Sequence, residues 1–244
     1  MWKIASPDRT LTVAISGSDS GALSYSVEEN GALAGSGALG ICTSIGDFSC
    51  GLRFVDTAEQ MIDEAYSLPV GKKKEYVNKA CETRLRFEKE GIPFHLLVRA
   101  YDNGAAFRYE IPDESRGASL EVYRETTDFC FPESFDTLWL QDWVASYEGP
   151  YNKTRWGPGH DGRHYGMPSL LHAPADSLWV MVNEANVPNA NGGYCISHGK
   201  GTAGRRLTLE FAPEEKGNPV PSPLPFCSPW RYLQVEDHLD DLVN

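Results

Sequence analysis

The most constraining feature of the sequence is a series of short runs rich in β-branched, aromatic and aliphatic residues that alternate with polar ones. A period of two residues places successive side chains on opposite faces of a strand, so each run predicts a strand with one buried face. Eight runs have this pattern: 11–15, 23–27, 84–88, 94–101, 105–111, 178–183, 206–211 and 231–235. Helical periodicity is nearly absent, although residues 57–66 could form a short helix. The predicted fold class is therefore all-β with antiparallel sheets.

Turn signals divide these runs. Asp102, Asn103 and Gly104 separate two of them and tolerate the positive φ that a tight hairpin turn demands. Two segments rich in Gly and Pro, 151–168 and 213–229, predict long loops. All-β chains of 244 residues are commonly one domain, so residues 1–244 are predicted to form a single domain.

The charge balance limits the partners. The chain carries 22 Lys and Arg against 34 Asp and Glu, a net charge of −12, which repels phosphate backbones and anionic lipids. No apolar run approaches the roughly 20 residues that span a bilayer. Nucleic acid and membrane partners are therefore not expected. The start of the sequence has no secretory leader, which predicts a cytoplasmic protein, whereas a removed leader would place it in the periplasm or outside the cell. Six cysteines without a C-x-x-C pair predict free, mostly packed thiols.

An aromatic cluster is the first candidate site. Trp139, Trp143, Tyr147 and Trp156 lie close together in the sequence, and Glu148 directly follows Tyr147. Aromatic faces beside carboxylate and amide groups suit the apolar faces and hydroxyl rims of sugars, so Trp143, Tyr147 and Glu148 are candidate carbohydrate-binding residues. A buried core face is the alternative interpretation of the same pattern.

Two further patterns involve metal-ligating residue types. The segment 160–164 holds two histidines and an aspartate, but a metal site needs three or four rigidly held ligands, so a solvated loop is expected. Glu184 ends a hydrophobic strand between Asn183 and Asn186, and such a carboxylate can supply one or two of the six to eight oxygens that Ca²⁺ takes. An ordinary hydrogen-bonded strand end is the alternative for Glu184. The sequence has no G-x-S-x-G elbow, and no catalytic residue is predicted.

Several longer motifs, in order from Ser6 to Val235, carry a resemblance to a known family. They are Ser6-Pro7-Asp8, 39–41 with 43–48, 99–109, 146–149, Asn183-Glu184-Ala185 and 228–231. With these motifs the chain resembles the N-terminal domain of glycoside hydrolase family 97. The resemblance implies an antiparallel β-super-sandwich like that of galactose mutarotases, placed before a (β/α)₈ barrel that carries the catalytic carboxylates.

The same resemblance implies hydrolysis of α-glucosides or α-galactosides, by inverting members or retaining ones, with Ca²⁺ in the active site. In this family the N-terminal domain lends one glutamate to the metal, and the Asn-Glu-Ala match implies Glu184. A barrel needs about 250 residues of its own. The catalytic barrel is therefore an expected partner outside this chain, and the chain alone is expected to be inactive and not to hold calcium.

Two other functions remain open. A free-standing carbohydrate-binding module would use the same aromatic surface without a barrel. A mutarotase-like epimerase would need an acid and a base across one sugar ring, for which His95, His172 and Glu184 are available, although the sequence gives no reason to pair them.

Overall fold

The structure is a computed structural model that describes residues 1–71, 73–112, 117–146, 148–187, 195–197 (backbone only), 204–211 and 218–243. The first half contains β1 (Trp2–Ala5), β2 (Leu11–Gly17), β3 (Leu23–Glu29), β4 (Ala32–Leu39), β5 (Ile41–Thr43), β6 (Gly46–Asp47), β7 (Arg53–Ser67), β8 (Glu75–Lys89), β9 (Ile92–Tyr101), β10 (Gly104–Ile111) and β11 (Ser119–Glu125). The second half contains β12 (Asp128–Cys130), β13 (Thr137–Asp142), β14 (Tyr151–Arg155), β15 (His164–Ala173), β16 (Leu178–Ala185), β17 (Cys195–Ser197), β18 (Arg206–Glu210), β19 (Val220–Pro223), β20 (Phe226–Cys227) and β21 (Trp230–Glu236), with the 3₁₀ helices η2 (Pro158–His160) and η4 (Leu239–Val243).

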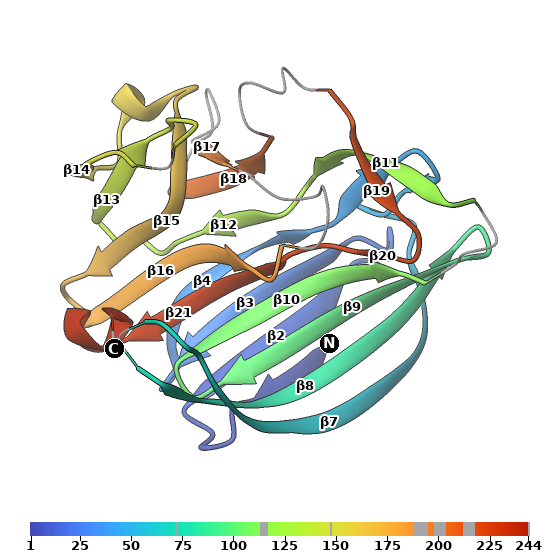
Figure 1. Ribbon diagram of the computed structural model, residues 1–244, viewed down its shortest axis with the longest axis horizontal. Helices are drawn as coiled ribbons and strands as arrows, with labels where there is room; N and C mark the ends of the chain where they lie inside the picture. Colours follow the sequence, from blue (N-terminus) through green and yellow to red (C-terminus); the bar gives the residue numbers. More distant parts are fainter. Residues whose placement is uncertain are drawn as a thin grey trace.

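The strands form two facing layers that are joined at β15 (Figure 1). One layer runs β7–β8–β9–β10–β21–β16–β15, and every pairing in it is antiparallel. The other runs β1–β2–β3–β4–β12–β18–β17 and returns to β15. A smaller antiparallel sheet, β19–β11–β5–β6, lies at one end. The expected antiparallel β-super-sandwich is confirmed.

Alternation along the strands separates a core face from an outer face. In β9 and β10 the inward positions include Phe94, Phe107 and Tyr109, all fully or almost fully buried. Phe107 lies 5.0 Å, centroid to centroid, from Tyr25 of the facing layer. The core therefore fills the space between the two layers, while the outer face of the β8–β9–β10–β21 sheet stays outside it. This outer face carries a separate apolar cluster of Leu97, Ala106 and Trp230.

Each of the eight strand predictions corresponds to a strand, and the hairpin prediction is also confirmed. Tyr101 pairs with Gly104, so Asp102 and Asn103 form a two-residue turn. Glycine is required at 104 because a Cβ there would lie 2.5 Å from the carbonyl oxygen of Leu233 on the neighbouring strand β21. The missing side chain of Gly104 thus lets β10 and β21 approach closely.

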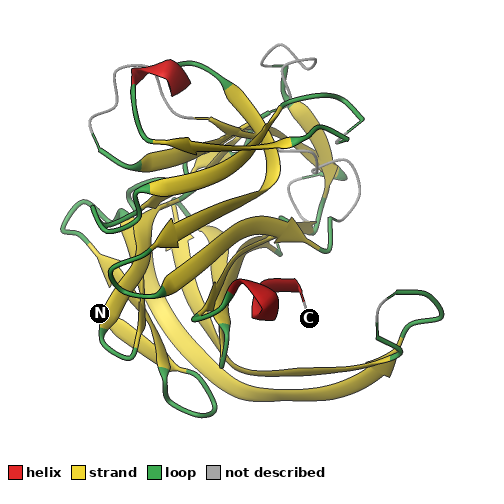
Figure 2. Ribbon diagram, turned by 90° about the vertical axis from the view of Figure 1, so that its left-hand side faces the viewer, coloured by secondary structure: helices red, strands yellow, loops and turns green. Residues whose placement is uncertain are grey.

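The predicted helix at 57–66 is wrong, because these residues belong to β7, which pairs along its whole length with β8. The two strands form a long hairpin that projects away from the body of the domain (Figure 2). Nearly every residue of β7 is exposed, so neither face of this strand is buried. Without a buried face the strand lacks the alternation by which the others could be recognised.

The two predicted long loops are partly wrong. Within 151–168, residues Tyr151–Arg155 form β14 against β13, and β15 begins at His164. Within 213–229, β19 and β20 are formed, and residues 213–217 lie outside the described part. The five cysteines that the structure describes in full are free thiols, as expected, and four of them are at least partly buried. In the described residues, no helix is long and apolar enough to span a membrane.

Candidate functional site

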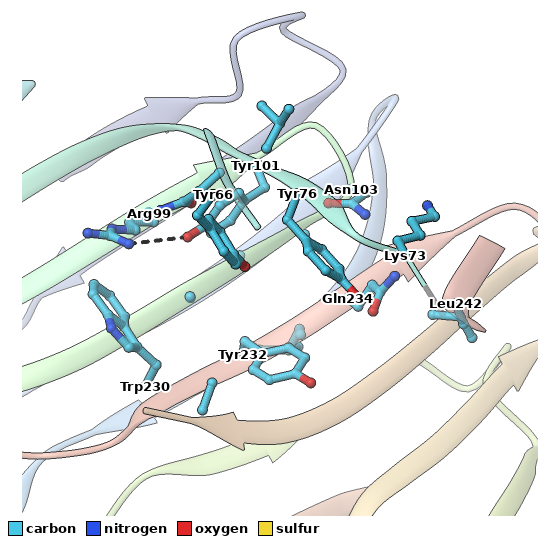
Figure 3. A pocket seen from close by; sticks show the side chains of 17 residues that line it. Tyr66, Lys73, Tyr76, Arg99, Tyr101, Asn103, Trp230, Tyr232, Gln234 and Leu242 are labelled. Atoms are coloured by element: carbon cyan, nitrogen blue, oxygen red, sulfur yellow. Dashed lines mark hydrogen bonds between the residues drawn. The ribbon is translucent and has the colours of Figure 1, made fainter. Parts of the chain in front are cut away.

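A pocket of about 660 Å³ lies on the outer face of the sheet, between the β7–β8 hairpin, β9, β10, β21 and η4. Most of its labelled side chains are aromatic or carry amide or cationic groups (Figure 3). They are Tyr66, Lys73 and Tyr76 from the hairpin segment, Arg99, Tyr101 and Asn103, and from β21 Trp230, Tyr232 and Gln234. Leu242 from η4 adds an aliphatic side chain. Sequence reasoning predicted the strands of β9, β10 and most of β21 but not the β7–β8 hairpin at Tyr66 and Tyr76, and it missed the site. The available signal was the aromatic residues at alternate positions 230 and 232.

Aromatic contacts fix the shape of this pocket. Trp230 lies against two guanidinium groups, with the Cζ atoms of Arg99 and Arg108 at 4.5 and 4.6 Å from its ring centroid. Across the pocket the rings of Tyr66 and Tyr76 stack with centroids 5.5 Å apart. The contacts of Trp230 with both guanidinium groups give the pocket a preformed wall on that side.

Two polar contacts hold the wall from behind. Arg99 Nε donates to Glu82 Oε2 at 2.6 Å, and Glu82 is almost fully buried. Asn183 Nδ2 donates to the hydroxyl of Tyr232 at 3.0 Å. Burial raises the pKa of Tyr232, against a smaller lowering by the bond from Asn183, so its hydroxyl stays protonated at neutral pH.

The composition of the pocket suits binding rather than hydrolysis. Its described lining contains no Asp, Glu, His, Cys or Ser side chain. Glycoside hydrolysis uses a pair of carboxyl groups on either side of the scissile bond. The described pocket therefore lacks the groups for that chemistry and offers instead aromatic faces with amide and guanidinium donors.

Glu184 lies near this pocket but on the other face of the sheet. Its neighbour Ala185 lines the pocket, and successive side chains of a strand point to opposite faces, so the carboxylate of Glu184 is directed between the layers. Arg231 is its direct cross-strand partner, and Arg231 Nη1 donates to Glu184 Oε2 at 2.5 Å. The side chain of Glu184 is 13% exposed, whereas that of Arg231 is fully buried.

Glu125, at the end of β11 in the small sheet, completes this ion network. Its fully buried carboxylate accepts from Arg231 Nη2 at 2.8 Å and from Nε at 3.2 and 3.3 Å. One guanidinium thus joins two carboxylates from different sheets, and the three groups together carry one net negative charge. The side chain nearest to solvent in the network is Glu184.

The other predicted site residues lie elsewhere. Trp143 is half-buried and its backbone N–H donates to the carbonyl oxygen of His164, whereas Glu148 is exposed. Neither residue lines the pocket, and Tyr147 lies outside the described residues. A carbohydrate role for these three residues stays a prediction.

The rest of the aromatic cluster makes packing contacts. Trp139 lies 5.2 Å from Trp179 in a row that continues to His172, which stacks on Trp179 at 3.9 Å between centroids. Trp156 packs against the main core and donates its indole N–H to the carbonyl oxygen of Phe135 at 2.7 Å. Trp156 is thus in line with the core alternative, whereas Trp139 is half-buried and lies outside the main core, which Leu138 and Leu140 join.

The prediction of a solvated loop at 160–164 is wrong for His160. This imidazole is buried, its Nδ1 lies 2.6 Å from the hydroxyl of Tyr165, and its Nε2 lies 2.9 Å from the carbonyl oxygen of Arg155. His164 instead pairs with Glu210 at 2.8 Å. Among the residues that the structure describes, no three His, Cys, Asp or Glu side chains converge on a possible metal position.

Known proteins resemble this chain over most of its length. A protein from Streptomyces bingchenggensis, described as "probable retaining alpha-galactosidase", is 29% identical over 82% of this chain and 29% of its own length. The crystal structure of a beta-arabinopyranosidase superimposes with a TM-score of 0.85 and 29% identity, covering 98% of this chain and 40% of that protein.

A glycoside hydrolase family 97 enzyme from Pseudoalteromonas sp. strain K8, solved in complex with acarbose, also superimposes with a TM-score of 0.85. It is 23% identical, covers the whole of this chain, and is itself covered over 37% of its length, so it supports the fold alone. The chain thus spans less than half of each of these relatives. Residues 4–244 match the family described as "Glycosyl-hydrolase 97 N-terminal". The chain therefore belongs to the glycosyl-hydrolase 97 N-terminal family.

Proposed function

We propose that this chain is the N-terminal accessory domain of a calcium-dependent α-glycosidase that hydrolyses α-glucosides or α-galactosides. Family membership over residues 4–244 carries the proposal. The relatives are longer than this chain, and two of them are described as glycosidases in their own names. The chemistry of bond cleavage is assigned to a catalytic barrel, and this domain is assigned a supporting role.

The outer face is the proposed contact with the barrel. It carries the apolar cluster of Leu97, Ala106 and Trp230 outside the main core, with Tyr101 and Tyr232 packed against it. These three side chains are almost fully buried, so the exposed apolar surface that favours a protein partner comes from neighbouring residues. The projecting β7–β8 hairpin adds exposed apolar side chains beside it, among them Met61 and Val77.

Glu184 is the proposed contribution to the metal. A carboxylate oxygen is the hard ligand that Ca²⁺ prefers, and the network of Glu125, Arg231 and Glu184 has a surplus negative charge that can attract a cation. Since no three His, Cys, Asp or Glu side chains of the described residues converge on a possible metal position, Glu184 fits one ligand of a site shared with another domain. When bound, the ion would polarise and orient the substrate. Within this chain, Arg231 holds the carboxylate through Oε2.

The first expected result is that the purified 244-residue chain has no α-glycosidase activity. The described pocket lacks a carboxyl pair, and family 97 chemistry is assigned to the barrel. Release of nitrophenol from aryl α-glucosides and aryl α-galactosides is the measurement, with the longer enzyme as positive control. Turnover by the chain alone, lost on substitution of one of its own residues, would contradict the accessory role.

A free-standing carbohydrate-binding module is the second candidate, because the pocket presents aromatic faces with amide and guanidinium donors. The same purified chain decides between the two candidates when it is titrated calorimetrically with α-linked gluco- and galacto-oligosaccharides. Binding that disappears in Trp230→Ala would favour the module, whereas the accessory role predicts no binding by the isolated domain.

The second expected result concerns Glu184→Gln in the longer enzyme that carries this domain. An amide oxygen is a weaker calcium ligand than a carboxylate, so calcium affinity should fall by about tenfold or more, and kcat/KM should fall with it. Calorimetry with CaCl₂ and turnover with and without chelator measure the two effects. Glu28→Gln, at an exposed carboxylate on β3 outside the network, is the control that should behave as wild type. Unchanged calcium affinity in Glu184→Gln would return Glu184 to a purely structural role.

A further inference from the structure

Arg231 connects Glu184 to a residue far away in the sequence. Glu125 engages Nε and Nη2 of the guanidinium, and Glu184 engages Nη1. A guanidinium is planar, and its five donors have a fixed relative geometry. Since Glu125 engages one edge of this plane, it determines where Nη1 points on the other side.

Burial makes this arrangement rigid. The side chains of Glu125 and Arg231 are both fully buried, and they belong to different sheets, β11 and β21. A buried carboxylate without its cation would be strongly unfavourable, so the pair is held together by the cost of separating it. Glu184 is the less buried member, at the end of β16, where a long side chain would otherwise sample several rotamers.

We propose that Glu125 and Arg231 are positioning residues that fix the direction of the Glu184 carboxylate at the end of the sandwich. Arg231 orients Glu184 directly, and Glu125 acts through Arg231. This inference rests on the proposed role of Glu184 in calcium binding. It adds two residues that hold Glu184 in place. One of them, Glu125, lies on a different sheet and 59 residues before Glu184 in the chain.

The test is Glu125→Gln in the longer enzyme that carries this domain. A neutral amide has one acceptor oxygen and cannot accept from both Nε and Nη2 as the Glu125 carboxylate does. Arg231 should then shift, and calcium affinity measured by calorimetry should fall by roughly 10- to 100-fold, the usual effect of removing a residue that orients a metal ligand. A crystal structure of the variant should show the Glu184 side chain in a changed or divided orientation.

Two further variants separate positioning from folding. Arg231→Lys keeps the charge but replaces the fork by one ammonium group, so it should also weaken calcium binding. Asp128→Asn removes another buried carboxylate, which lies on β12 and is paired with Arg206 of β18 at 2.5 Å. β12 pairs with β18 and β4, and with neither β16 nor β21. Asp128→Asn should lower stability while leaving calcium affinity unchanged. Circular dichroism confirms that each variant is folded.

The outcomes distinguish this inference from the proposed function. If folded Glu125→Gln and Arg231→Lys bind calcium as wild type while Glu184→Gln does not, Glu184 is a ligand without a positioning pair, and the inference is overturned. If Glu184→Gln also binds calcium as wild type, the proposed metal role has failed and the inference falls with it. Equal losses in Asp128→Asn and Glu125→Gln would assign the effect to general destabilisation and would equally overturn the inference.

Discussion

Replacement of Arg231 by Met should lower the free energy of unfolding of this domain by about 3–5 kcal/mol, because it leaves the fully buried carboxylate of Glu125 without its cation. Met fills much of the same volume, so the loss reports the unpaired charge rather than a large cavity. For a domain of this size each kcal/mol corresponds to roughly 2–4 °C in the melting temperature. Urea and thermal unfolding of the 244-residue chain at pH 7 measure the effect.

A double variant and a matched pair control this prediction. Replacing both partners by apolar residues, in Arg231→Met with Glu125→Leu, should recover much of the stability, because no buried charge is then left unpaired. Arg99→Met should cost less than Arg231→Met, because its partner Glu82 keeps a hydrogen bond of 2.6 Å from Gln60 Nε2. A loss below about 1 kcal/mol in Arg231→Met would mean that water or a neighbour compensates Glu125 within the sandwich.

The strands of the core could be predicted because they alternate. In β2, for example, Leu11, Val13 and Ile15 are buried while the residues between them are less so, and this pattern is visible in the letters alone. β7 lacks a buried face, and its Ala, Glu, Gln and Met residues favour helices locally. Its strand conformation is imposed by pairing with β8, which is a tertiary contact.

The candidate site shows the same division between local and long-range information. The position of Glu184 near the end of a hydrophobic strand could be predicted, because the strand pattern depends on nearby residues. Its pairing with Arg231 depends on the register between β16 and β21, and the contact with Glu125 depends on how the small sheet meets the large one. The pocket is likewise assembled from the β7–β8 hairpin, the strands β9, β10 and β21, and η4. No local pattern predicts these distant contacts.

Glu29 should make the stability of the domain fall as the pH rises from about 4.5 to about 7. Burial is the main cause that raises the pKa of its carboxyl group from 4.5 to about 7, and repulsion by Asp237, Glu236 and Asp8 adds to it. Its Oε2 is buried and has no hydrogen-bond partner among the described residues. Because the folded state binds the proton more tightly than the unfolded chain, this stabilisation is complete below the unfolded pKa and is lost as the pH passes through the folded one.

Glu29→Gln should therefore raise the free energy of unfolding by about 1–3 kcal/mol at pH 8 and change it little at pH 4.5, where the wild-type group is already neutral in the fold. Urea unfolding at several pH values between 4.5 and 8 gives the difference between the two proteins. The control is Glu28→Gln, which removes the same charge from the exposed neighbour on β3. A gain for Glu29→Gln that is constant across this pH range would locate the effect in packing or in the unfolded chain. A gain that grows with pH, absent from Glu28→Gln, follows only if the buried carboxylate of Glu29 becomes charged among Asp8, Glu236 and Asp237.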